Sequence, residues 1–268
     1  MMHIAKVKAE KDIKPSIQKA VDEIGGFDNF VKKGETVLIK PNYNTADESP
    51  ASTAPDFLAA TVELVFAAGA KRVIVGESST FTISNHSIST EKTLCKACVY
   101  DLQKSKTPPD IYIFDDHQWV TKQIPEGKYL KKVSVPKIMD EVDKIILLPC
   151  CKTHFIADFT GALKIIIGFM KPTERISLHL GKVSEKVAEM NTIYTPDLII
   201  MDARKCFITG GPSKGTIREP GLVLASTSRV DIDIEEVRII QSFKGNSLAG
   251  KIPEDISQIK RAKELKVL

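Results

Sequence analysis

The spacing of apolar and polar residues along the chain predicts alternating strands and helices. Short apolar runs that end at proline, glycine or polar residues are typical of buried strands. They predict strands at residues 3–8, 36–41, 71–76, 111–114, 131–135, 143–149, 196–202 and 222–226. Amphipathic stretches with capping residues predict helices at residues 12–30, 55–68, 90–105, 161–169, 174–190, 231–243 and 256–265.

This order of elements predicts the fold class. An opening β-α-β-α-β order is typical of a parallel sheet with right-handed crossovers. We therefore predict an α/β fold with Rossmann-like layers, in which a mostly parallel sheet carries helices on both faces. The 268 residues suit a single domain over residues 1–268, with two lobes at about 1–142 and 143–268 as the alternative. Loops are predicted at residues 42–54 and 80–89, and irregular structure at 115–129.

Polar residues follow two of the predicted strands directly, where ligands bind in sheets of this kind. Lys40 and Asn42 lie at the carboxyl end of the strand at 36–41, and Lys152, Thr153 and His154 follow the strand at 143–149. These residue types suit an anionic ligand, and His154 also suits an acid, a base or a metal ligand.

A helix that starts at Thr160 or Gly161 would offer N-terminal amides to an anion. Lys164 would lie one turn further along, on the same helix face as Thr160. The sequence therefore predicts that Thr160, Gly161 and Lys164 bind a carboxylate or phosphate, with Lys164 and His154 as catalytic candidates.

Three more residues extend this predicted site. His179, between apolar neighbours, is either a metal ligand or proton-transfer partner of His154, or a packed histidine. Asp202 ends a predicted strand, where a carboxylate often orients a catalytic partner. Gly211 belongs to a Gly-Gly-Pro run that either lets the backbone approach a ligand or forms a plain turn.

Composition excludes several classes of function. A net charge of +4, from 38 basic and 34 acidic residues spread along the chain, argues against bulk nucleic-acid binding but is compatible with a local anion pocket. We expect a cytoplasmic protein without a membrane partner, because no signal peptide and no membrane-length apolar run is present. Cys95 and Cys98 form a single C-x-x-C pair, which predicts free thiols, with a redox or zinc role as the alternative.

The sequence resembles the family called domain of unknown function 362 over nearly its whole length. The resemblance lies in Ile-Lys-Pro-Asn at 39–42, Val-Gly-Glu-Ser at 75–78, Lys-Thr-His at 152–154, Thr-Gly-Ala-Leu-Lys at 160–164, and residues 168, 179, 196–202, 211–215 and 230–233. Family members often carry Asp where Glu77 stands. Some carry an appended ferredoxin module, and we expect no iron–sulfur cluster within this chain.

A shorter stretch is similar to the nickel-pincer lactate racemases, in the spacing of His154 and Lys164 with Thr-Gly before the lysine. This resemblance implies that Lys164 carries a cofactor and His154 moves a proton or hydride. It also implies that His179 is a nickel ligand.

Three functions remain open at this point. The first is an enzyme, such as an isomerase or racemase, that acts on a small anionic ligand held by Lys40, Lys152 and Lys164. The second is a metal- or cofactor-binding protein without turnover, in which His154 and His179, with Cys151 or Asp158, bind nickel, zinc or iron. The third is a module that partners a separate iron–sulfur protein. Metal analysis and co-purification would distinguish the last two.

Overall fold

A computed structural model describes residues 4–78 and 89–267 and contains one large sheet. The main path of this sheet has the strand order β1-β12-β10-β7-β2-β3-β4. In that order the strands are Ile4–Lys8, Leu222–Ser226, Leu198–Gly210, Lys144–Leu147, Thr36–Lys40, Arg72–Glu77 and Asp110–Ile113. The sheet joins strands from both sides of residue 142, since β7 pairs with β2.

The sheet is mostly parallel, as predicted. Strands β10, β7, β2, β3 and β4 pair in parallel, whereas β12 is antiparallel to both of its neighbours, β10 and β1. The predicted opening differs in one respect, because β1 pairs with β12 at the far edge and not with β2. The chain therefore leaves β1 and crosses the sheet before it forms the central strands.

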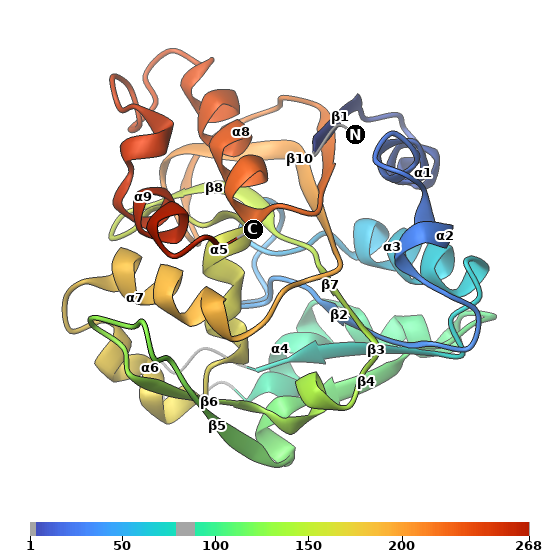
Figure 1. The fold of residues 1–268 in the computed structure, drawn as a ribbon. Coiled ribbons are helices and arrows are strands. Elements are labelled where there is room, and N and C mark those ends of the chain that lie inside the picture. Colours follow the sequence, from blue (N-terminus) through green and yellow to red (C-terminus); the bar gives the residue numbers. More distant parts are fainter. Residues whose placement is uncertain (1–3, 79–88, 268) are drawn as a thin grey trace.

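Helices cover both faces of the sheet (Figure 1). Helices α1 (Ile13–Asp22) and α3 (Pro55–Ala67) pack on one face against side chains such as Val37 and Val73. Helices α5 (Gly161–Lys164), α7 (Val183–Met190), α8 (Arg229–Gln241) and α9 (Ser257–Glu264) pack on the other, against side chains such as Leu38 and Ile74. Successive strand residues point to opposite faces, so the continuous apolar runs supply both cores.

Four predicted helices are interrupted where the backbone takes a positive φ or tightens into a 3-10 turn. The first divides at Gly25 and Gly26 into α1 and α2 (Phe27–Phe30), and the third divides at Cys98 into α4 (Thr90–Lys96) and a 3-10 helix, Val99–Lys104. Similarly, α6 (Pro172–Leu178) is separate from α7, and α5 continues as the 3-10 helix Ile165–Phe169. Left-handed residues end helices, which explains most of these breaks.

Several strands lie in segments that were predicted to be irregular or were not assigned. Strands β5 (Trp119–Gln123) and β6 (Lys132–Pro136) form a separate hairpin, so residues 115–129 are not simply irregular. Strands β8 (Cys150–His154) and β9 (Asp158–Phe159) follow β7 directly, and β11 (Gly215–Arg218) pairs with the end of β10. Single 3-10 turns lie at Phe114–Asp116, Lys137–Asp140, Asn191–Ile193 and Pro253–Asp255.

Two findings concern the extent of the structure. The loop predicted at residues 80–89 lies outside the described residues apart from residue 89. Within the described part of the chain, every helix is too short or too polar to cross a lipid bilayer.

Candidate functional site

A cavity of about 580 Å³ lies at the carboxyl ends of strands β2, β3 and β8. Its wall includes Lys40 at the end of β2, Asn42 just after this strand, and Lys152 and His154 on β8. Further predicted residues on the same wall are Thr160, Lys164 and His179. The structure therefore gathers at one place residues that stand more than a hundred positions apart in the sequence.

Lys40 is held by a buried ion pair in this wall. Its Nζ donates to Glu77 Oε1 at 2.5 Å and to the carbonyl of Pro41 at 2.7 Å. Glu77 also accepts from the backbone amides of Tyr43 and Ser78. Burial lowers the pKa of Lys40, and the adjacent Glu77 carboxylate opposes that fall. Lys40 is thus neutralised within the protein, so its charge is not free for a ligand.

Gly168 leaves the space that the Lys40 side chain occupies. A Cβ at position 168 would lie 2.5 Å from Lys40 Cε and 2.6 Å from its Nζ. Any larger residue would push the lysine away from Glu77. Glycine is therefore required at position 168 for space, and not because the backbone there has a positive φ.

Lys164 differs from Lys40 because its amine has no partner. In the described part of the chain it makes no side-chain hydrogen bond or ion pair, and only its backbone amide is bonded, to the carbonyl of Thr160. Burial, and then the nearby charge of Lys152, lower the pKa of Lys164 to about 7. The side chain of Lys164 is partly buried, and an amine that has lost part of its hydration without gaining a partner is stabilised by an anion beside it.

Lys152 contributes a second cation to the cavity. Its Nζ donates to the carbonyl of Ala51, and its backbone amide donates to Glu236 Oε1 at 2.8 Å. Burial lowers the pKa of Lys152, while the surrounding Cys150, Glu236 and Asp47 oppose the fall. A carbonyl is a neutral partner, so the charge of Lys152 is not cancelled.

His154 is held as a neutral imidazole with a defined tautomer. Its Nδ1 accepts from the backbone amides of Ile156 at 3.1 Å and Ala157 at 3.3 Å, so the ring proton lies on Nε2. Burial, followed by the charges of Lys164 and Lys152, lowers the pKa of His154 to about 2. At neutral pH His154 therefore offers a ligand a hydrogen-bond donor without a charge.

Three residues of the cavity wall carry a buried polar atom without a hydrogen-bond partner among the described residues: Asn42, Tyr43 and Thr160. Two of these atoms, Asn42 Nδ2 and Thr160 Oγ1, belong to residues that the sequence predicted to bind a ligand, and each residue is almost fully buried. Buried polar groups are normally paired, so such atoms point to a missing ligand or water. Both atoms are able to donate to an oxygen.

The helix N-terminus predicted to bind an anion is already occupied. The amides of Ala162 and Leu163 donate to the buried carboxylate of Asp233 on α8, at 2.5 and 2.9 Å. Gly161 does not line the cavity, and its φ of +53° with Asp233 Oδ1 2.4 Å from a would-be Cβ requires glycine. The predicted use of these amides for a ligand is therefore wrong, because the protein supplies its own carboxylate.

Three other predicted residues lie outside the cavity. Thr153 points to the opposite face of β8 from Lys152 and His154, as alternation along a strand requires. Asp202 pairs with Arg204 at 2.7 Å, and Arg204 in turn pairs with Asp56. A Cβ on Gly211 would lie 1.8 Å from the carbonyl oxygen of Thr153, so this glycine allows β8 to approach, not a ligand.

The residues at the site do not fit a resident divalent metal. Across residues 4–78 and 89–267, no three His, Cys, Asp or Glu side chains gather as ligands. His179 donates from Nδ1 to the carbonyl of Arg175 and leaves Nε2 free, whereas His154 carries its proton on Nε2. Cys151 is buried beside Cys206, and Asp158 pairs with Lys251 at 2.5 Å. The positive charges of the lysines on the cavity wall would also disfavour the binding of a metal cation.

Two residues of the wall were not assigned a role from the sequence. Glu77 is the partner of Lys40, and the polar end of β3 was the signal that could have identified it. Arg175 donates to Ser78 Oγ at 2.8 Å and to the carbonyl of Met170 at 2.9 Å. Burial lowers the pKa of Arg175 to about 10. Its neighbours in sequence, Glu174 and Ile176, gave no sign that it is buried.

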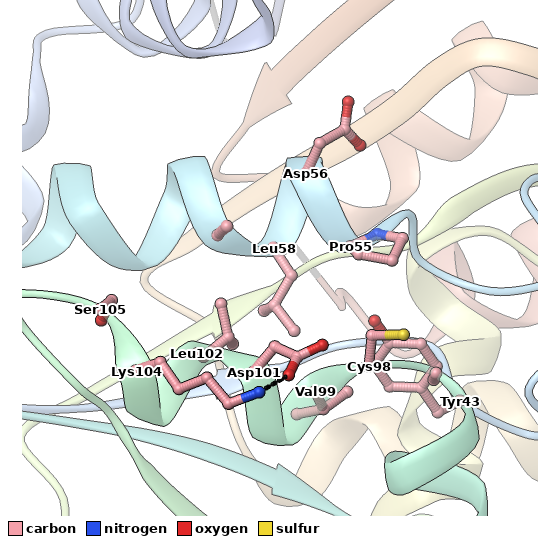
Figure 2. Close-up of a pocket in the computed structure, with 12 residues that line it drawn as sticks. Tyr43, Pro55, Asp56, Leu58, Cys98, Val99, Asp101, Leu102, Lys104 and Ser105 are labelled. Carbon is pink, nitrogen blue, oxygen red and sulfur yellow. Dashed lines mark hydrogen bonds and ion pairs between the residues drawn. The ribbon is translucent and has the colours of Figure 1, made fainter.

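A second cavity of about 450 Å³ lies between α3 and the 3-10 helix Val99–Lys104 (Figure 2). Apolar residues such as Leu58 and Leu102 line it, and the Asp101–Lys104 ion pair of 2.6 Å lies at its edge. Cys98 lines this cavity and is a free, exposed thiol. Tyr43 lines both cavities, so its ring forms a wall between them.

The fold and the first cavity define an α/β protein with a cation-rich pocket at the carboxyl edge of a mostly parallel sheet. The chain belongs to the family described as domain of unknown function (DUF362), whose model matches residues 37–237.

Two known proteins are similar to this chain. The thylakoid-associated protein sll1697 of Synechocystis is 26% identical over 234 residues, which cover 84% of this chain and 69% of that protein. The lactate racemase apoprotein of Thermoanaerobacterium thermosaccharolyticum shares 14% identity with a TM-score of 0.47, over 83% of this chain. The matched part is 54% of the racemase chain, so about half of that enzyme has no counterpart here.

Proposed function

We propose that this protein binds a small anionic ligand in the cavity formed by β2, β3, β8 and α5. The observation that carries the proposal is the unpaired amine of Lys164, which shares a cavity with unpaired Thr160 Oγ1 and Asn42 Nδ2. His154 adds a neutral donor, and the one acidic side chain among the described lining residues, Glu77, is neutralised by Lys40. A carboxylate or phosphate accepts from all of these groups.

Calorimetric titration with acetate, lactate, pyruvate and inorganic phosphate tests this proposal. Lys164→Met should weaken binding by about 10- to 100-fold, because a hydrogen bond to a charged group contributes roughly 1.5–3 kcal/mol. Thr160→Val should weaken it less, and Lys263→Met, at an exposed lysine on α9, should leave it unchanged. The proposal is wrong if no anion binds, or if Lys164→Met binds as well as the unchanged protein.

Proton transfer to or from the bound acid, as in an isomerase or racemase, is the second candidate function. It is favoured by the pKa of Lys164, about 7, because a group that titrates near neutral pH both accepts and donates a proton readily. Incubation of each acid with the protein in D₂O would show deuterium at the carbon beside the carboxylate. Exchange that persists in Lys164→Met would exclude this role.

A further inference from the structure

The mouth of the candidate site carries an unusual set of exposed apolar side chains. Phe155 is 75% exposed, Ile156 48%, Ile176 39% and Leu180 78%, and all four line the cavity. Phe155 and Ile156 lie in the turn between β8 and β9, and Ile176 and Leu180 lie on or directly after α6. Two separate elements therefore present apolar surface at the same opening.

Few other large apolar side chains of the described residues are as exposed as these four. Among the described residues, Ile217 and Ile252 are the other large apolar side chains with comparable exposure, and neither lines this cavity. Single exposed apolar residues are ordinary, but a contiguous group around an opening marks a surface that binds something apolar.

The volume of the cavity also exceeds what a small acid needs. At about 30 Å³ for each water-sized group, a three-carbon hydroxy acid would fill only about a third of the 580 Å³. Ligands of well-formed pockets usually bury most of their surface. The remaining space leads from the cationic groups to the apolar mouth.

We infer that the ligand is an amphiphilic anion, with a carboxylate or phosphate head and a hydrocarbon chain or ring. This inference rests on the proposed function, because it assigns the head to Lys164, Thr160 and Asn42. The apolar part then lies against Phe155 and Leu180 and removes their side chains from water. The cationic floor and the apolar mouth are thus two ends of one binding site.

The chain length of the ligand supplies a direct test. Acetate, butyrate, hexanoate and octanoate share one head group and are titrated below the concentrations at which they form micelles. We expect affinity to rise about two- to fourfold with each added methylene, which corresponds to half to full burial of that group. Octanoate should therefore bind at least about tenfold more tightly than butyrate.

Variants at the mouth show whether the gain comes from these residues. The double variant Phe155→Ser with Leu180→Ser should lose most of the gain in affinity with chain length, measured relative to its own affinity for acetate. Both side chains are largely exposed, so neither change disturbs the core. Ile252→Ser is the matched control, because Ile252 is 60% exposed and lies away from the cavity. It should keep the full dependence on chain length.

The outcomes separate this inference from the proposed function. Equal affinity for all four acids, with binding still lost in Lys164→Met, would refute the amphiphilic ligand and leave the anion site intact. Failure of every acid and of phosphate to bind would refute the proposed function itself. If Phe155→Ser lowers the mass of an oligomer in light scattering and leaves the chain-length series unchanged, the mouth is a protein interface and the inference is wrong. Co-sedimentation with phosphatidylglycerol vesicles, without binding of monomeric octanoate, would also overturn it.

Discussion

Replacement of Lys164 by methionine should stabilise the protein while it removes anion binding. Methionine keeps the length and helix propensity of the side chain and removes the amine. In the folded protein the Lys164 side chain is partly buried without a counter-charge, whereas in the unfolded chain its amine is fully hydrated. The fold therefore disfavours the charged form, and the variant no longer has this cost.

The size of the effect follows from the pKa of Lys164. A fall from 10.5 in the unfolded chain to about 7 in the fold corresponds to roughly 5 kcal/mol. Between these two values the unfolded state binds the proton and the folded state does not, so stability rises with pH across this window. The cost is fully present below pH 7 and has disappeared above pH 10.5.

Urea unfolding of both proteins at two pH values measures this difference. We expect Lys164→Met to be more stable by at most about 5 kcal/mol at pH 6, since the side chain is only partly buried, and by at most about 2 kcal/mol at pH 9. Lys263→Met, at an exposed lysine, reports the effect of the same replacement without burial. A variant that is less stable than the unchanged protein at pH 6, or a difference that does not shrink by pH 9, would refute the assignment of Lys164 as a partly buried amine without a partner.

Three further results are expected. In Lys164→Met the pKa of His154 should rise, because the charge of Lys164 is the second cause, after burial, of the low pKa of His154. NMR titration of the ring protons measures this pKa, and an unchanged value would show that the two side chains do not interact. Gly161→Ala should destabilise the protein by several kcal/mol in urea unfolding, since the new Cβ would meet Asp233 Oδ1 in a left-handed backbone; a loss below about 1 kcal/mol would contradict that geometry. Asp202→Asn should leave the affinity for anions unchanged in calorimetry, because this side chain lies outside the cavity, and a tenfold loss would show that it takes part in binding.

The general position of the candidate site could be predicted from the sequence. Strands such as β2 and β7 are continuous apolar runs that end at proline or lysine, and in a parallel sheet their carboxyl ends meet at one edge. Lys40 ends β2, and Lys152 and His154 lie on β8, which begins a few residues after β7, so their proximity follows from the sheet order. Strand pairing and local pattern are enough for this part of the prediction.

The partners of each charged group could not be predicted, because they depend on side chains from distant elements. Asp233 on α8 occupies the amides at the start of α5, and Arg204 joins Asp202 to Asp56. Neither contact has a local sequence signal. For the same reason, the sequence did not distinguish Lys40, which is neutralised by Glu77, from Lys164, which has no such partner. A prediction from residue type alone therefore assigns an anion-binding role to both lysines.

The hydrogen bonds that join α8 to β8 and α5 have a consequence for folding during synthesis. Asp233 and Glu236 hold Ala162, Leu163 and Lys152 across sequence separations of 71, 70 and 84 residues. As the nascent chain emerges from the ribosome, β8 and α5 precede α8. Their hydrogen bonds to Asp233 and Glu236 therefore cannot form until α8 has been synthesised. The candidate pocket is thus among the last parts of the molecule to form, and a chain interrupted before α8 would expose the sheet face that this helix covers.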